Sequence, residues 1–377
     1  MPNVIDLLEK LIACPSVTPE DAGAQEILAA ELDALGFEIH HLPFEDETGR
    51  VPNLFARIGS AAPHICFAGH TDVVPPGAAE QWTYGPFTPT IKDGVIYGRG
   101  ASDMKGAVAA FVVAAKEYLA GNTPKGSISL LITGDEEDIA VNGTVKVLEW
   151  MKDNGHTPDV ALVGEPTNPA HLGQEIKIGR RGSLNGTLTV KGTQGHVAYQ
   201  HLADNPMPRL IKLADALASH KFDTGSEFFP PTNLEITSID VGNGASNIIP
   251  EKGIIRFNIR FNDQWSSTSL KAKIAELLEQ TGAPYDIEFE GNAESFITKP
   301  DAWTQCVQGA VTDIAGKTPA YTTTGGTSDA RFISQHCPTI ECGAVNNSIH
   351  QIDENAKVSD LEALVQIYRR VLERYFA

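Results

Sequence analysis

Residues 64–72 read HICFAGHTD, an apolar run that ends in Gly69-His70-Thr71-Asp72. Such a run is typical of a buried strand, and its polar residues follow at the point where the strand ends. A second stretch, GASDMKG at residues 100–106, opens a helical pattern that continues to Leu119. One His and one Asp therefore lie where a strand ends and a helix begins, which is a position that places side chains in a cleft.

Apolar runs and helical patterns alternate on both sides of these stretches. Residues 3–13 and 20–36 are predicted helices, and residues 127–133 and 159–163 are predicted buried strands. After residue 300 the alternation of strand and helix patterns returns, with predicted helices near 303–314 and 359–375. Strands that alternate with helices predict an α/β fold in which a mixed sheet is flanked by helices.

Between residues 180 and 293 the pattern changes to alternating strands interrupted by two helices. This order predicts an inserted α+β sandwich with one free sheet face. The expected domains are therefore a catalytic domain at 1–179 and 294–377, and an insert at 180–293. A symmetric partner could bury the free face of the insert, and a solvated face is the alternative.

The composition excludes several classes of partner. The chain of 377 residues has a formal net charge of −19, which argues against nucleic acids and anionic membranes, because both need clustered cations. A small acidic substrate remains possible, since it needs only local arginines. No apolar run is long enough to span a membrane, and the first ten residues do not resemble a secretory signal. Five scattered cysteines fit a reducing compartment, so a cytoplasmic protein is expected.

Acidic residues and one histidine follow the ends of the predicted strands. In open α/β sheets these ends converge on one edge. Carboxylates crowded there raise one another's pKa unless a cation neutralises them, and His with carboxylate ligands suits zinc, cobalt or manganese. The candidates from this pattern are His70, Asp72, Asp103, Asp135, Glu136, Glu137 and Glu165.

The spacing of these candidates suggests separate roles. Asp103 springs from a tight Gly-flanked loop, and its two oxygens could bridge a pair of metals. Glu136 and Glu137 point apart in an extended loop, so one can ligate while the other acts as general base. Asp72 can hydrogen-bond the free imidazole nitrogen of His70. Each residue alone has a plainer reading, such as a helix N-cap for Asp103, and only the convergence favours a metal site.

Several motifs resemble those of the aminoacylase/carboxypeptidase metallohydrolase superfamily. Two of them, GHTDVVPPG at 69–77 and YGRGASDMKG at 97–106, resemble the signatures of the whole superfamily. The resemblance extends from the first predicted helix to the last. The further matching motifs are RRGS at 180–183, QGHVAY at 194–199, FFPPT at 228–232, NIIP at 247–250 and GGTSDARF at 325–332.

The resemblance implies a site with two zinc ions, with cobalt possible in one or both positions. His70 and Glu165 would hold one metal, and Glu137 and His350 would hold the other. Asp103 would bridge them, Glu136 would be the base, and Asp72 would assist His70. His350 is assigned by the resemblance alone, because a lone His before the last helix carries no signal of its own.

The resemblance also implies a reaction: hydrolysis of the amide of N-succinyl-LL-2,6-diaminopimelate to succinate and LL-2,6-diaminopimelate. An acetylornithine deacetylase or an aminoacylase-like hydrolase would share the same metal site and is the alternative. A non-catalytic metal-binding or scaffold protein is a third reading. The insert would form a homodimer in which His196 reaches the partner's active site. The implied substrate contacts are Arg180, Arg260, Asn247, Tyr199, Gly326 and Thr327.

Overall fold

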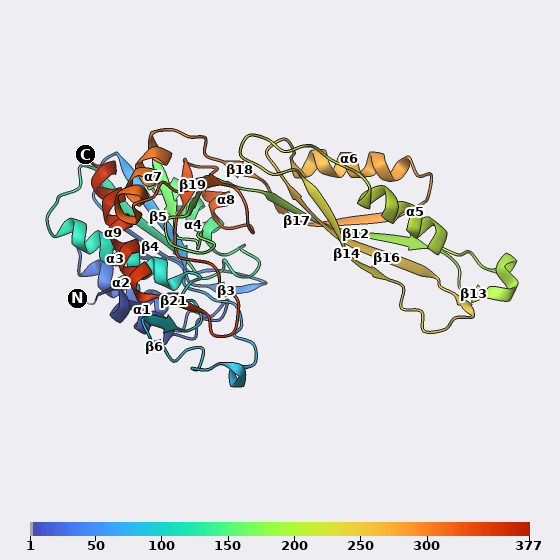
Figure 1. Ribbon diagram of the computed structural model, residues 1–377, viewed down its shortest axis with the longest axis horizontal. Helices are drawn as coiled ribbons and strands as arrows, with labels where there is room; N and C mark the ends of the chain where they lie inside the picture. Colours follow the sequence, from blue (N-terminus) through green and yellow to red (C-terminus); the bar gives the residue numbers. More distant parts are fainter. Residues whose placement is uncertain (1–2) are drawn as a thin grey trace. The chain divides into compact units, whose positions relative to one another are not determined.

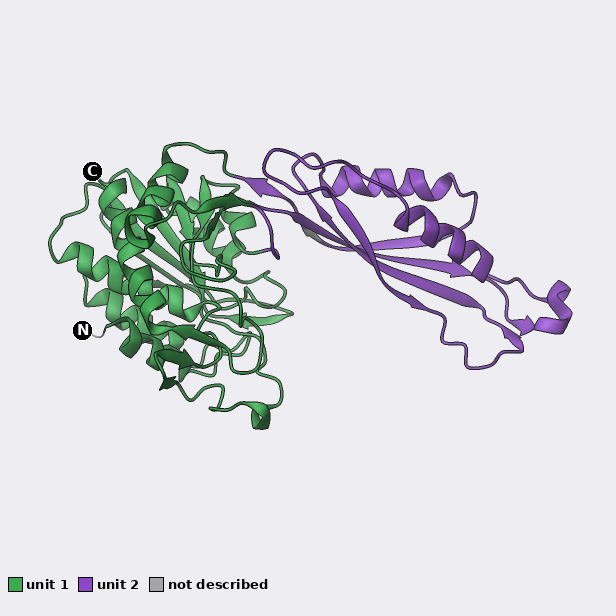
Figure 2. Cartoon of the chain, viewed as in Figure 1, with its two compact units in different colours: residues 1–179, 298–322, 328–377 green, residues 180–297, 323–327 purple. Residues whose placement is uncertain are grey.

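The computed structural model describes residues 3–377 of the chain. The chain divides into two units, coloured green and purple in Figure 2. Unit 1 runs to Gly179 and resumes at Thr298–Thr322 and Ser328–Ala377, whereas unit 2 comprises Arg180–Ile297 and Thr323–Thr327. Residues 294–297 and the short segment Thr323–Thr327, both expected in the catalytic domain, thus cluster with unit 2.

Unit 1 contains a large mixed sheet, two smaller sheets and most of the helices (Figure 1). Its helices are α1 (Val4–Ile12), α2 (Ala24–Asp33), η1 (Ala79–Gln81), α3 (Lys105–Leu119), α4 (Thr144–Asp153), α7 (Ala302–Ala315), α8 (Ala330–Ile333) and α9 (Val358–Tyr375). Its strands are β1 (Glu38–His41), β2 (Phe44–Asp46), β3 (Gly49–Val51), β4 (Leu54–Ile58), β5 (His64–His70), β6 (Thr90–Lys92), β7 (Val95–Tyr97), β8 (Ser127–Thr133), β9 (Val160–Val163), β10 (Glu175–Lys177), β19 (Ala320–Thr322), β20 (Thr339–Glu341) and β21 (Asn355–Lys357).

The large sheet has the strand order β1-β4-β8-β5-β9-β20-β10-β19. Its centre is parallel: β5 lies between β8 and β9, and β20 runs parallel to β9 on the far side. The outer strands β1 and β4 are antiparallel. Because β5, β8 and β9 are parallel neighbours, their carboxyl ends meet at one edge of the sheet.

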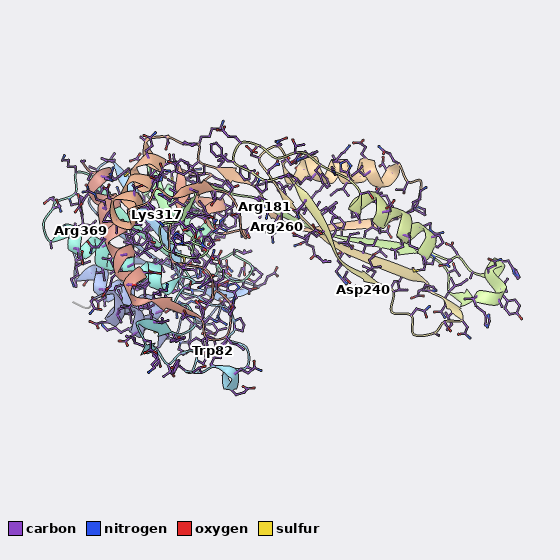
Figure 3. The ribbon with its side chains drawn as sticks, viewed as in Figure 1. Trp82, Arg181, Asp240, Arg260, Lys317 and Arg369 are labelled. Carbon is purple, nitrogen blue, oxygen red and sulfur yellow. The ribbon has the colours of Figure 1, made fainter. Side chains whose placement is uncertain are left out.

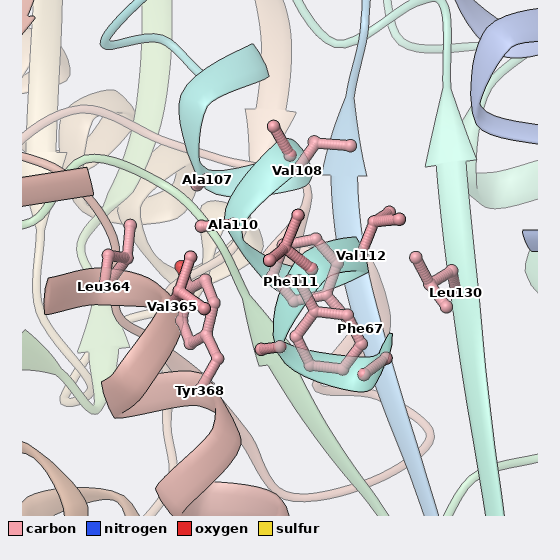
Figure 4. Packing of buried hydrophobic residues seen from close by; sticks show 14 of the residues in the cluster. Phe67, Ala107, Val108, Ala110, Phe111, Val112, Leu130, Leu364, Val365 and Tyr368 are labelled. Atoms are coloured by element: carbon pink, nitrogen blue, oxygen red, sulfur yellow. The ribbon is translucent and has the colours of Figure 1, made fainter. Parts of the chain in front are cut away.

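Helix α3 anchors the core of unit 1. It is buried on nearly every side, since it lies under α1 and α9 as well as against the sheet. The Phe67 ring of β5 stacks on Phe111 of α3 at a centroid distance of 4.2 Å, and Tyr368 of α9 packs edge-on against Phe67 (Figure 4). This packing holds the start of α3, and with it Asp103, against the end of β5.

Unit 2 is a four-stranded antiparallel sheet with the order β14-β16-β12-β17 and two helices on one face. Alternate residues of β12 and β16 are buried, which is the pattern of a sheet with one covered face. The elements of this part of the chain are β11 (Gly179–Arg180), β12 (Gly182–Lys191), β13 (Gly195–His196), η2 (Val197–Leu202), α5 (Met207–Ala218), β14 (Asn233–Asp240), β15 (Ile248–Ile249), β16 (Lys252–Phe261), α6 (Ser267–Glu279), β17 (Asp286–Ala293) and β18 (Phe296–Ile297).

The predicted fold class, a mixed α/β sheet flanked by helices and interrupted by an α+β insert, is confirmed. The structure differs from the predicted fold in the limits of one helix and in two short strands. Helix α2 begins at Ala24 rather than near residue 20, and the short strands β10 and β19 were not predicted. No helix in the described part of the chain is long and apolar enough to cross a membrane.

Candidate metal centre

The candidate ligands converge at the carboxyl edge of the large sheet. Strand β5 ends at His70, β8 ends just before the loop of Glu136 and Glu137, and β9 ends just before Glu165. Asp103 enters from the loop before α3. The parallel pairing of the three strands is the physical reason why residues separated by up to 95 positions from His70 become neighbours.

A first triad consists of His70, Asp103 and Glu165, whose ligand atoms all lie within 4.8 Å of one another. His70 Nε2 lies 3.4 Å from Asp103 Oδ1 and 3.7 Å from Glu165 Oε1. All three residues are buried. One imidazole nitrogen and two carboxylates are a donor set that suits zinc and related divalent metals.

A second triad consists of Asp103, Glu137 and His350, also within 4.8 Å. His350 Nε2 lies 3.3 Å from Asp103 Oδ2 and 3.2 Å from Glu137 Oε1. Asp103 thus turns one oxygen toward each histidine, which is the geometry of a bridging carboxylate. These two triads contain the five residues that the family resemblance assigned to metals, and their assignment as ligands remains a prediction.

The buried donor atoms fit a cation. His70 Nε2 and Asp103 Oδ1 are both buried and have no hydrogen-bond partner among the described residues. Buried polar atoms are ordinarily satisfied, so this pair needs a further partner. A divalent metal between these atoms would satisfy both at once.

The electrostatics of the triads point to the same conclusion. Burial opposes protonation of His70, yet the surrounding carboxylates, Asp103 first, hold the pKa of its imidazole well above the usual value. Contacts with Asp103 and Glu137 raise the pKa of His350 to about 10. The site therefore concentrates negative charge that attracts cations, whether protons or metals.

Glu136 belongs to neither of these two triads, although its carboxylate also lies within 4.8 Å of ligand atoms of His70 and Glu137. Its Oε2 atom is 3.9 Å from His70 Nε2. Burial, followed by the neighbouring Glu165 carboxylate, raises the pKa of Glu136 well above its ordinary range. The Glu136 side chain is only 14% exposed, and such a partly buried carboxyl group of raised pKa next to a metal site is suited to accept and return a proton.

Asp72 and Asp135 shape the site from outside the triads. Asp72 Oδ1 is buried, has no hydrogen-bond partner among the described residues and lies 3.6 Å from His70 Nδ1, so the hydrogen bond expected between the Asp72 side chain and His70 is made by the Asp72 main chain instead. His70 Nδ1 lies 2.8 Å from the Asp72 main-chain oxygen, whereas the Asp72 carboxylate accepts a bond from the Glu137 amide at 3.0 Å. The main-chain oxygen of Asp72 thus orients His70, and the Asp72 carboxylate orients the loop that carries Glu136 and Glu137. The Asp135 carboxylate accepts two bonds, from the amides of Val141 and Asn142, and so shapes the same loop.

Sequence reasoning missed two residues next to Glu136. A cavity of about 10 Å³, enough for one water, is lined by His70, Glu136, Glu165, Thr144 and Asp329 among others. Asp329 is 5% exposed, and burial raises its pKa. The GGTSDARF motif contains Asp329, but that motif directed attention to Thr327, and nothing in the sequence marks Thr144.

Unit 2 holds the residues that were expected to contact substrate, in two separate groups. In the first group, Arg180 is buried and its Nη1 atom donates to the Gly326 oxygen at 3.2 Å, beside Thr327. Arg260 of β16 lies across from the start of β12, and the neighbouring Arg181 and Arg260 are labelled at the same end of the sheet in Figure 3. Burial lowers the pKa of Arg260, so this end of unit 2 carries cations in a partly dry setting.

The second group lies beyond the other end of β12. His196 belongs to the two-stranded pair β13–β15, where Val197 donates its amide to the Asn247 oxygen at 3.1 Å. The Tyr199 ring is 5.6 Å from the His196 ring, and both side chains are exposed. The ten residues of β12 separate the two groups by roughly 30 Å, at about 3.3 Å per residue.

Comparisons with known proteins give the family and the fold of the chain. The model of peptidase family M20/M25/M40 matches residues 66–374. The succinyl-diaminopimelate desuccinylase of Rhodospirillum centenum is 55% identical, over 100% of this chain and 98% of its own length.

Solved structures of lower identity share the fold. An M20 family metallo-carboxypeptidase from Sulfolobus solfataricus aligns with a TM-score of 0.80 at 20% identity, over 100% of this chain and 99% of its own. A dinuclear metal binding peptidase of the M20 family from Bacillus subtilis aligns with a TM-score of 0.72 at 14% identity, over 98% and 96% of the two chains.

Proposed function

Because the chain belongs to peptidase family M20/M25/M40, we propose that it hydrolyses N-succinyl-LL-2,6-diaminopimelate to succinate and LL-2,6-diaminopimelate, a step in diaminopimelate and lysine biosynthesis. Membership confirms the resemblance to metallohydrolases that the sequence motifs indicated. The enzyme is a metal-dependent hydrolase with a dinuclear centre.

One observation carries the choice of substrate: 55% identity over the whole chain to a relative that bears the corresponding name. The geometry of unit 1 supports hydrolysis, because two triads share one carboxylate beside the partly buried Glu136. This geometry does not distinguish one acyl amide from another, so the choice of substrate depends on the sequence identity to this relative.

We assign zinc to both positions, with cobalt as an acceptable substitute. His70, Asp103 and Glu165 would hold one ion, and Glu137 and His350 would complete the other around the same Asp103. When bound, the two ions would polarise the amide carbonyl, lower the pKa of the attacking water and neutralise the charge that develops on oxygen.

Glu136 moves the proton in this proposal. Its carboxylate accepts a proton from the attacking water as the water oxygen bonds to the succinyl carbonyl carbon. The same carboxyl group then delivers that proton to the nitrogen of the departing amine as the C–N bond breaks. Asp72 orients both His70 and the loop that carries Glu136, so it supports this transfer without joining it.

The arginines of unit 2 would hold the substrate carboxylates. Guanidinium groups bind carboxylates in a bidentate manner, and Arg180 and Arg260 are partly or fully buried, which strengthens such pairs. Gly326 and Thr327 would add contacts beside Arg180.

The separation within unit 2 supports a homodimer. His196, Tyr199 and Asn247 lie roughly 30 Å from Arg180 along β12, too far for one small substrate to touch both groups in a single chain. We therefore assign His196 to the active site of a second copy, where it stabilises the developing oxyanion. The five cysteines are free thiols, which fits the proposed cytoplasmic location.

A side-by-side assay tests the substrate. The zinc-loaded enzyme should cleave N-succinyl-LL-2,6-diaminopimelate with a kcat/KM well above that for acetylornithine. A higher kcat/KM for acetylornithine would show that the proposed substrate is wrong and that the enzyme hydrolyses a different acyl amide. Tight zinc binding without hydrolysis of any acyl amide would instead identify a scaffold protein.

A further inference from the structure

A buried ion pair lies directly behind the metal centre. Arg99 is 2% exposed and Glu354 is fully buried, and Arg99 Nη1 lies 2.7 Å from Glu354 Oε2. Neither side chain points a donor atom into either metal triad. Replacing a buried ion pair with apolar groups is often neutral or stabilising, so stability alone is a poor explanation for such a pair.

The other oxygen of Glu354 holds the loop of the bridging ligand. Glu354 Oε1 accepts main-chain hydrogen bonds from Ser102 and Asp103, each at 3.0 Å. Bonds from amides to a carboxylate are stronger than bonds between neutral groups. The backbone from which the Asp103 side chain extends is thus fixed by a charged acceptor.

Arg99 extends the same network to the other two ligand segments. Its Nη1 atom donates to the Gln351 oxygen at 3.1 Å, one residue after His350. Its Nη2 atom donates to the Pro75 oxygen at 3.4 Å, in the loop that follows His70. The guanidinium also lies 5.1 Å from the Trp82 ring centroid, which limits its movement.

We propose that Arg99 and Glu354 are positioning residues that set the spacing between His70, Asp103 and His350, and so the spacing of the two metals. This inference rests on the ligand set of the proposed function. One ion pair joins the backbone of all three segments, so a change in the pair shifts the ligands relative to one another.

The backbone around His350 shows why such a clamp is needed. His350 and Asp353 adopt φ angles of 60° and 59°, a region that non-glycine residues occupy at a cost. The segment between them is short and the His350 side chain is half exposed. Residues 350–352 are exposed, and Thr83 holds the far end of this segment through the Asp353 carboxylate, whereas the Arg99 bond to the Gln351 oxygen lies directly beside His350.

Glu354→Gln is the first test. The amide preserves the size of the side chain, but its NH2 group must face either Arg99 or the two main-chain amides, all of which are donors. We expect Co²⁺ to dissociate from one of its two positions 10–100-fold more readily into a chelator, the range typical for losing a residue that orients a ligand. The visible absorption of the Co²⁺ protein should change as well.

Arg99→Lys is the second test, useful if Glu354→Gln folds poorly. A lysine can still pair with Glu354 but cannot also reach the oxygens of Gln351 and Pro75. We expect weaker binding at one position here too. Ser127→Ala is the matched control, because it removes the hydrogen bonds that the buried Ser127 hydroxyl donates to the Ala61 oxygen and accepts from Arg57, at the end of β8 far from the metal triads.

The outcomes separate this inference from the proposed function. If both variants bind two Co²⁺ ions with the affinity and spectrum of the native protein, or if Ser127→Ala weakens binding as much, the positioning role is overturned. Failure of the native protein to release succinate would overturn the substrate instead, and that result appears without any variant.

Discussion

The two ends of strand β5 each carry a buried histidine, and the two have opposite environments. His64 at the start has partners for both ring nitrogens: Nε2 lies 2.7 Å from the Ser129 hydroxyl and Nδ1 lies 3.3 Å from the Thr157 oxygen. His70 at the end has a main-chain partner for Nδ1, but Nε2 has none among the described residues.

The pKa values follow these environments. Burial lowers the pKa of His64 to about 4, so it stays neutral. At the other end, four carboxylates outweigh burial and raise the pKa of His70. A buried histidine that the chain satisfies by itself is part of the structure, whereas one left open among carboxylates is prepared for a ligand.

The largest expected effect is loss of turnover at the His70 end. Glu136→Ala removes the proposed base, so kcat should fall by about 10²–10⁴-fold. Metal content should stay near that of the native enzyme, because Glu136 is outside both triads that share Asp103. Steady-state kinetics and metal analysis check both parts.

A carboxylate at the His64 end supplies the control for this comparison. Asp159 accepts a bond from the His64 amide at 2.7 Å. Asp159→Asn should leave kcat nearly unchanged. Near-normal turnover in Glu136→Ala would show that the assignment of the base is wrong.

Removal of metal should have the next largest effect. Metal bound to the folded state alone adds about 4 kcal/mol to the free energy of unfolding at a thousand times its Kd. A chelator should therefore lower the denaturation midpoint of the native protein. His70→Ala should respond much less, and His64→Gln should respond as the native protein does. If the chelator lowered the denaturation midpoints of the two histidine variants equally, the proposed difference between the two ends of β5 would be wrong.

The smallest effect is a pH dependence that belongs to His64. Its pKa is about 4 when folded and near 6.5 when unfolded. Between these values the unfolded chain binds a proton that the folded chain does not, so stability falls as the pH falls. The loss approaches about 3 kcal/mol at pH 4 relative to pH 7. The free energy of unfolding in urea should be measured against pH for the metal-free protein and for metal-free His64→Gln. The native protein should lose this amount between pH 7 and pH 4 and the variant should not. Parallel plots of the free energy of unfolding against pH would contradict the prediction.

The central strands and the convergence of the acidic residues could be predicted from sequence. The limits of β8 match the predicted strand at 127–133, because long apolar runs identify buried parallel strands. His70 and Asp103 could be placed because they sit next to such elements. Strands β10 and β19 could not, since three residues carry no periodicity and their pairing is set by distant neighbours.

Other features depend on tertiary contacts that no local pattern records. His350 lies in an irregular loop with a left-handed backbone, and only family motifs pointed to it. The bonds from Ser102 and Asp103 to Glu354 span about 250 positions of sequence. The segment Thr323–Thr327 packs with unit 2 because Arg180 binds its main chain, a contact that composition cannot reveal.

The position of β20 in the large sheet has a consequence for synthesis of the chain. Although β20 comes at residues 339–341, it lies next to β9, which ends at Val163. A ribosome working at about 5–20 residues per second needs roughly 10–35 s between the two strands. During that time β9 has an open edge in the nascent chain, a template for wrong pairing. Metal supplied early would therefore meet no finished centre, because the segment that carries the proposed ligand His350 emerges after β20.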